Sequence, residues 1–130
     1  MSKSIRYQLA EINYFQYMSF YDEDDNYLGK IVFNEDNKKD NIELIYIFVN
    51  EKYRTKNLSS TFYQMFEKLF LDHEFKSITL TAKEHVEKFG KLKKLYQSWG
   101  FVTNGKERVH YDGDYCFTKI PMSKTLNENT

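Results

Sequence analysis

The sequence predicts an α+β (mixed α/β) fold, in which helices pack on a mixed, twisted sheet. Residues 42–49 are almost continuously apolar, as expected for a central strand that is covered on both faces. A long amphipathic helix follows, because apolar residues recur there at the spacing of one helical face: Leu58, Phe62, Met65, Phe66 and Leu69. Residues 77–82 (SITLTA) then form a β-branched strand. A strand, a helix and a strand in this order predict a right-handed parallel crossover.

The remaining elements lie on either side of this crossover. Residues 14–21 and 27–33 are predicted to form a hairpin around the turn DEDDN, and residues 5–9 a short strand before it. The polar residues 34–41 are expected to be a loop. After the crossover we expect a helix over 86–98, which Gly100 ends, and strands over 101–103 and 115–122. Without the short strand at 5–9, the predicted order is βββ-α-β-α-ββ, in one domain over residues 1–122, with a polar C-terminal tail over 123–130.

Composition narrows the possible functions. The 130 residues suffice for one domain, and 19 basic residues balance 19 acidic ones, so a general nucleic-acid or membrane-surface binder is not expected. No apolar run reaches the roughly 20 residues of a membrane span, and the N-terminus does not resemble a signal peptide, which predicts a cytoplasmic protein. Cys116 has no partner for a disulfide and is interpreted as a buried small side chain. His73, His85 and His110 lack ligand spacing, so no metal site is predicted.

The turn between the apolar strand and the long helix is a candidate anion site. The first backbone N–H groups of a helix have no partner within it, and the helix dipole adds partial positive charge at the same end. Asn57 is a suitable N-cap residue, and small hydroxyl residues follow it in the first turn. Arg54 and Lys56 add two positive charges in the turn. A basic turn can also be simply solvated, so the pattern alone is weak.

The segment VNEKYRTKNLSS resembles the acetyl-CoA-binding signature of the GNAT N-acetyltransferases, in which Arg or Gln precedes two small residues at fixed spacing. Arg54 matches the first position, while Asn57 and Ser59 stand where the family has Gly and Gly or Ala. Asn tolerates a left-handed conformation and Ser is small, so both replacements are mild. The resemblance implies cofactor-binding roles for Ile47, Phe48, Val49, Arg54, Thr55, Lys56, Asn57, Leu58, Ser59 and Ser60.

A second motif strengthens the resemblance. The segment LYQSWGF is similar to a GNAT motif that consists of Leu or Phe, then Tyr, three further residues, and Gly-Phe. The preceding segment FGKL looks like the version of this region found in a subset of the family. The resemblance assigns to Tyr96 the role of protonating the leaving CoA thiolate. As a pattern alone, Tyr96 would more often be a core residue, one turn after Leu92. Phe89 replaces an asparagine that many members carry.

The resemblance, which covers residues 14–122 in outline, implies transfer of acetyl from acetyl-CoA to a primary amine by direct attack in a ternary complex. The carbonyl oxygen of the acetyl thioester would accept a hydrogen bond from a backbone N–H near Phe48 and Val49. The pantetheine chain of the cofactor would lie along the edge of the same strand. Glu43 resembles the glutamate that serves as the base in the histone-modifying branch. The alternative for Glu43 is a strand-end carboxylate in water, and many members use ordered water as the base.

Two other interpretations remain open. The family usually places one or two helices between its first two strands, and only about four residues separate these strands here. The chain could therefore be a catalytically weak or inactive GNAT-like module that acts through a partner protein. It could also be a small aromatic-rich protein that binds a peptide at a sheet edge, with accidental motif matches. The acceptor could be a small molecule or a protein, and a homodimer is possible because the open side would expose aromatic surface.

Overall fold

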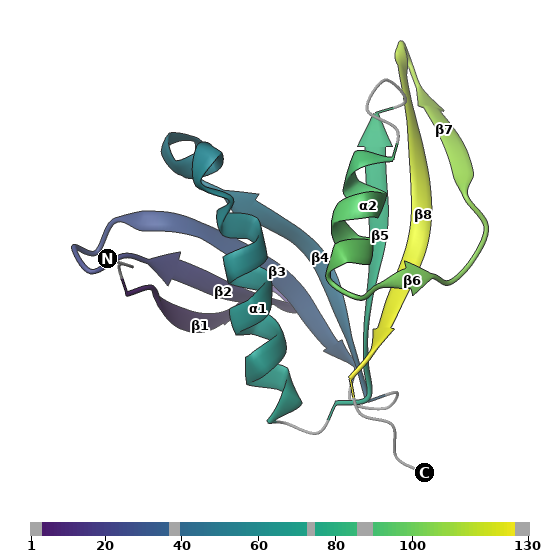
Figure 1. The fold of residues 1–130 in the computed structure, drawn as a ribbon. Helices are drawn as coiled ribbons and strands as arrows, with labels where there is room; N and C mark the ends of the chain where they lie inside the picture. The colour runs from purple at the N-terminus through teal and green to yellow at the C-terminus, as the bar shows by residue number, and fades with distance from the viewer. Residues whose placement is uncertain (1–3, 37–39, 73–74, 86–89, 127–130) are drawn as a thin grey trace. The chain divides into compact units, whose positions relative to one another are not determined.

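The computed structural model describes residues 4–36, 40–72, 75–85 and 90–126, with Thr55 and Lys56 described by their backbone alone. The chain divides into two units, Met1–Phe75 and Lys76–Thr130 (Figure 1). The elements of the first unit are β1 (Arg6–Ile12), β2 (Phe15–Tyr21), β3 (Tyr27–Asp36), β4 (Asn41–Val49), the 3-10 helix η1 (Glu51–Lys56) and α1 (Leu58–Leu71). The second unit contains β5 (Ser77–His85), α2 (Lys91–Ser98), β6 (Val102–Thr103), β7 (Arg108–Asp112) and β8 (Tyr115–Thr125).

The first unit is an antiparallel meander of four strands. β1 pairs with β2, β2 with β3 and β3 with β4. A two-residue turn joins β1 to β2, and its residues Asn13 and Tyr14 have φ values of 50° and 73°. Two consecutive left-handed residues are typical of a type I′ hairpin turn. The tight turn confirms that no helix stands between the first two strands.

One helix and one face of this meander form the core of the first unit. Phe62, Phe66 and Phe70 point from α1 into the core and are buried. Phe62 stacks on Phe20 of β2, with ring centroids 4.1 Å apart, and Phe33 of β3 contacts both Phe66 and Phe70 edge-on at 5.2 Å. Packing of these buried rings holds α1 on the sheet.

Gly29 permits this close packing. A Cβ atom at residue 29 would lie 2.1 Å from the Phe48 carbonyl oxygen and 2.7 Å from a ring carbon of Phe62. Both the neighbouring strand and the helix therefore approach the β3 backbone more closely than any side chain allows. Glycine is required here by space as well as by its φ of 154°.

In the second unit, β8 lies between two strand partners. β5 pairs antiparallel with β8 over its whole length, and β6 and β7 pair with β8 on its other edge. α2 packs beside β5 (Figure 1). The core of this unit includes buried residues from β5 and β8: Ile78, Leu80, Ala82, Ile120 and Met122.

The element types agree with the sequence prediction, but several boundaries were wrong. β3 continues through Asp36, into residues predicted as loop, because it pairs there with the start of β4. β8 continues to Thr125 rather than ending before a tail at Ser123, because its last residues pair with the first residues of β5. β7 was not predicted. Residues 86–89, the predicted first turn of the second helix, lie outside the described residues, and α2 begins at Lys91.

Candidate functional site

The chain leaves β4 at a fixed point because Asn50 fastens the following turn to β3. The Asn50 backbone N–H donates to the carbonyl of Leu28 at 2.7 Å, and its side-chain Nδ2 donates to the carbonyl of Tyr27 at 3.0 Å. Its Oδ1 accepts from the backbone N–H of Lys52 and so caps η1. The turn predicted between the apolar strand and the long helix is therefore a 3-10 helix that Asn50 anchors to β3.

Asn57 redirects the chain from η1 into α1. Its φ of 55° and ψ of 37° are left-handed, the conformation that asparagine was predicted to supply in place of glycine. Asn57 stands at the N-cap position as expected, but its side chain makes no capping hydrogen bond, and its backbone is not in the β region that a capping residue usually adopts. α1 also has no acidic residue in its first turn. Such a helix N-terminus attracts anions.

A cavity of about 400 Å³ lies where β4 ends and α1 begins. All of its lining residues belong to the set predicted to bind the cofactor: Ile47, Phe48, Val49, Arg54, Asn57, Leu58 and Ser59. Ser60 follows in the first turn of α1 and is half-buried. The side chains of Thr55 and Lys56 lie outside the described residues. Folding thus brings the predicted strand end and the predicted turn around one space.

Arg54 contributes the positive charge of this cavity. Its Nε donates to the carbonyl of Val49 at 3.2 Å, and its guanidinium carbon lies 5.9 Å from the centre of the Phe48 ring. The side chain is exposed. The contacts to Val49 and Phe48 hold the cation next to the strand end rather than leaving it extended in solvent.

The spacing of the second motif has a structural cause at the end of α2. Gly100, with φ of 98°, terminates the helix. The backbone N–H of Phe101 donates to the carbonyl of Tyr96 at 3.1 Å, and that of Gly100 to the carbonyl of Gln97 at 3.0 Å. These two bonds form a Schellman motif, whose accompanying apolar contact is the Tyr96–Phe101 pair at 6.4 Å. The motif, in which three residues separate Tyr96 from Gly100 and Phe101 follows, is thus the sequence of a helix C-terminus.

Tyr96 combines a packed ring with a protonated hydroxyl. The ring is half-buried and also lies 5.4 Å from the Trp99 ring. Burial raises the pKa of the Tyr96 hydroxyl above its usual value, and the negative charge of Glu84 raises it further. The hydroxyl therefore carries its proton at neutral pH. Packing and a chemical role are compatible in this residue, as expected from the sequence.

Glu84 was not predicted and is a buried carboxylate of the second unit. It is 6% exposed, and its two oxygens accept the backbone N–H groups of Gly90 at 2.9 Å and Leu92 at 2.6 Å. The carboxylate thus caps the N-terminus of α2 from β5. A signal was present in the sequence, because Glu84 follows Ile78, Leu80 and Ala82 in the two-residue alternation of the buried face.

Glu43, the predicted candidate base, lies on β4 opposite Asn34 and is exposed. This placement agrees with the alternative, a strand carboxylate that faces water. His85 lies edge-on to Tyr115 at 6.3 Å, and His110 stacks on Phe117 at 5.7 Å, so both rings have aromatic neighbours. His73 and Phe89 lie outside the described residues.

Within the described ranges, no group of three or more His, Cys, Asp or Glu side chains is arranged to hold a metal ion. The same part of the chain contains no helix long and apolar enough to cross a membrane.

Comparison with solved structures shows the same fold in several acetyltransferases. The spermidine/spermine N-acetyltransferase of Vibrio cholerae aligns with a TM-score of 0.74 and 19% identity, over 88% of this chain and 66% of that one. The ribosomal-protein-S18-alanine N-acetyltransferase of Escherichia coli aligns with a TM-score of 0.75 and 14% identity, over 92% of this chain and 74% of that one. Nourseothricin acetyltransferase aligns with a TM-score of 0.65 and 14% identity, over 88% and 67% of the two chains.

Sequence comparison identifies the family. A search of curated proteins found no significant match. The family profile described as "Acetyltransferase (GNAT) domain" matches residues 2–126, nearly the whole chain. Together with the cavity after β4 and the Tyr96 helix terminus, this match shows that the chain belongs to the GNAT acetyltransferase family.

Proposed function

We propose that the protein transfers an acetyl group from acetyl-CoA to a primary amine by direct attack in a ternary complex. The observation that carries this proposal is the cavity of about 400 Å³ between the end of β4 and the first turn of α1. Its lining coincides with the residues to which the GNAT signature assigns cofactor binding. When bound, acetyl-CoA supplies the acetyl group activated as a thioester.

The residues around this cavity suit a pyrophosphate and a pantetheine chain. The backbone N–H groups at the start of α1, near Leu58 and Ser59, would bind phosphate oxygens, and Arg54 would add a charge-assisted bond. Ser59 is small, and Asn57 holds its left-handed conformation without glycine. Ile47, Phe48 and Val49 would hydrogen-bond an extended chain along the end of β4. The same N–H groups near Phe48 and Val49 are the candidates for stabilising the carbonyl oxygen.

Tyr96 is the proposed acid. The departing sulfur must take up a proton, and the raised pKa of Tyr96 keeps a proton on its Oη at neutral pH. The amine nitrogen must lose a proton in the same reaction. Glu43 is the candidate to accept that proton, directly or through water, because it lies on β4 and its exposure leaves the carboxylate accessible. Most of the acceleration would come from positioning, for which effective molarities allow about 7–11 kcal/mol.

The acceptor is proposed only as an amine. The relatives are named for spermidine and spermine in one case and for an alanine of a ribosomal protein in another, and their shared chemistry is an amine nitrogen. Because no helix lies between β1 and β2, the proposal includes both small molecules and proteins as acceptors.

Calorimetric titration with acetyl-CoA tests the proposal, with desulfo-CoA and ATP as specificity controls. We expect micromolar binding of acetyl-CoA, followed by acetylation of an amine in an acceptor screen. Absence of binding at millimolar acetyl-CoA would overturn the proposal. That result would favour the alternative of a GNAT-like protein-interaction module.

A further inference from the structure

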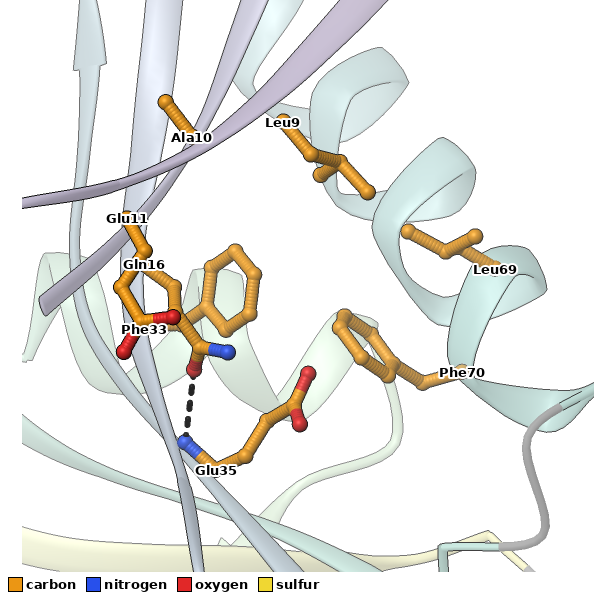
Figure 2. A pocket seen from close by; sticks show the side chains of 8 residues that line it. All are labelled: Leu9, Ala10, Glu11, Gln16, Phe33, Glu35, Leu69 and Phe70. Atoms are coloured by element: carbon orange, nitrogen blue, oxygen red, sulfur yellow. Dashed lines mark hydrogen bonds between the residues drawn. The ribbon is translucent and has the colours of Figure 1, made fainter.

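A second cavity, of about 300 Å³, lies in the first unit at the other end of α1. Its apolar lining comes from β1, β3 and the last turn of α1, as Figure 2 shows: Leu9, Ala10, Phe33, Leu69 and Phe70. Phe33 and Phe70 are buried, whereas Leu9 remains 54% exposed. The buried side of the cavity is therefore aromatic, and the side that opens to solvent is aliphatic.

Two carboxylates and one amide complete the lining: Glu11, Glu35 and Gln16. Glu11 of β1 lies opposite Gln16 of β2, and Gln16 lies opposite Phe33 of β3. These three side chains therefore form a row across the strands, on the face of the sheet that α1 covers. Glu35 follows Phe33 two residues later on the same strand and so shares its face. Figure 2 shows the Glu35 carboxylate directed toward Phe70, over the cavity.

Gln16 holds this arrangement in place. Its Oε1 accepts the backbone N–H of Glu35 at 2.9 Å, across the two strands. The bond orients the Gln16 amide between the two acidic side chains (Figure 2). Glu35 is half-buried, and the salt bridge observed among the described residues joins Arg6 and Asp25, not either carboxylate of this cavity. Two carboxylates, the half-buried Glu35 and the exposed Glu11, thus border one largely apolar cavity, and neither is paired with a cation among the residues described.

This combination has a definite chemical preference. Carboxylates beside apolar walls favour a ligand that has a cationic head and an aliphatic body. The Phe33 and Phe70 rings would contact the body and can add cation–π attraction to the head. A neutral apolar ligand would leave the charges unpaired, and an anion would be repelled.

We propose that this cavity is an accessory binding site for a primary alkylammonium ion, held by Glu35 and Glu11 with its chain against Leu9, Leu69 and Phe70. Residue 69 lies 11 residues after Leu58 on the same helix, which is about 16 Å along the axis. Reacting atoms must approach to about 3–3.5 Å, so an amine in this cavity is not the one that is acetylated. The site is distinct from the proposed cofactor cavity.

Titration of the protein with hexylammonium, without acetyl-CoA, tests the proposal. NMR or calorimetry should detect binding, and hexan-1-ol and hexanoate, which match it in length, should bind at least about tenfold more weakly. Because this titration contains no acetyl-CoA, it tests the accessory site independently of the proposed acetyl transfer. Addition of acetyl-CoA, or the substitution Arg54→Ala, should leave the affinity for hexylammonium unchanged.

Two substitutions locate the site. Glu35→Gln should weaken hexylammonium binding about tenfold and leave the Tm of the unliganded protein unchanged or higher, because one of two neighbouring like charges is removed. Leu9→Ala should weaken binding by removing the aliphatic side of the cavity without changing its charge, and the fold should tolerate it because Leu9 is 54% exposed. Glu107→Gln, an exposed carboxylate in the loop before β7, is the matched control and should bind like the unsubstituted protein.

Three results would overturn the proposal. One is equal binding of hexan-1-ol and hexylammonium, which would make the cavity a nonspecific apolar site. Another is unchanged affinity in both Glu35→Gln and Leu9→Ala. The third is a loss of hexylammonium affinity at higher protein concentration, accompanied by dimer formation in light scattering. That result would show that a second copy of the chain covers the cavity.

Discussion

At the residue scale, the two candidate site residues of the GNAT signatures are held by backbone contacts as well as by side chains. Val49 accepts the Nε hydrogen of Arg54, and the Tyr96 carbonyl receives the last bonds of α2. The bonds of Tyr96 are made by its backbone and remain when the hydroxyl is removed, whereas the bond of Arg54 is made by its exposed side chain and is lost when that side chain is truncated. Arg54 and Tyr96 therefore give distinct predictions.

Arg54→Ala should raise the Kd for acetyl-CoA about tenfold to a hundredfold, since one charge-assisted contact contributes about 1.5–3 kcal/mol. The Tm should change little, because Arg54 is exposed. Calorimetry gives the Kd and a thermal scan gives the Tm. Arg108→Ala, an exposed arginine on β7, is the control. Equal affinity in Arg54→Ala and the unsubstituted protein would show that the anion site was assigned to the wrong residue.

Tyr96→Phe should reduce kcat about a hundredfold or more and leave the affinity for acetyl-CoA nearly unchanged, because only the hydroxyl is lost. The raised pKa of Tyr96 also predicts that its ionisation does not limit the rate of the unsubstituted enzyme below about pH 10. Steady-state rates from pH 6 to 9.5 measure both effects. Full activity in Tyr96→Phe would reduce this tyrosine to a packing residue; Tyr111→Phe, an exposed tyrosine, is the control.

At the element scale, the termini of the helices explain the family motifs. α1 begins at a left-handed asparagine without a side-chain cap, which leaves its first turn suited to an anion. α2 begins on the buried Glu84 carboxylate and ends in the Schellman motif at Gly100. The backbone N–H groups at the start of α1 are thus suited to an anion, whereas the backbone groups at both ends of α2 form hydrogen bonds within the protein.

Glu84→Gln should destabilise the protein by about 1–3 kcal/mol, because an amide offers one acceptor oxygen where the carboxylate provides two. It should also lower the pKa of Tyr96 toward its usual value by removing the neighbouring negative charge. Urea denaturation measures the stability, with Glu107→Gln as control. If Glu84→Gln unfolds at the same urea concentration as the unsubstituted protein, the cap contributes nothing to stability.

At the scale of the whole molecule, buried tyrosines link stability to alkaline pH. Burial raises the pKa of Tyr63 well above its usual range, and the nearby negative charge of Glu67 adds to the effect. Burial also raises the pKa values of Tyr96 and Tyr27. In the unfolded chain a tyrosine ionises near pH 10. The folded state therefore binds these protons more tightly, and its stability is full below about pH 10 and falls as pH rises further.

Tyr63→Phe should accordingly reduce the loss of stability between pH 9 and pH 11, since one tyrosine with a raised pKa is removed. Urea midpoints at the two pH values measure the loss. Tyr111→Phe, exposed on β7, should lose as much stability as the unsubstituted protein. An identical loss in Tyr63→Phe would mean that Tyr63 does not contribute to alkaline unfolding.

The sequence by itself determined what depends on local pattern. Hydrophobic periodicity predicted the strand at 42–49 and the helix after it, and the GNAT signatures predicted the residues that line the cavity at the start of α1. The strand and the helix were confirmed, because neighbouring residues make both the strand end and the helix N-terminus, whereas cofactor binding by the residues of this cavity stays a prediction. The left-handed Asn57 was predictable for the same reason, since few other side chains tolerate that conformation.

Only the tertiary structure decided the features that join distant segments. β3 and β8 extend beyond their predicted ends because partner strands supply hydrogen bonds to polar residues that look like loop. Glu84 becomes a helix cap only when β5 lies beside α2, and the cavity with Glu11 and Glu35 requires three strands and the last turn of α1. Polar side chains have no fixed local signal for such roles, because their partners are set by how the chain folds rather than by their neighbours in sequence.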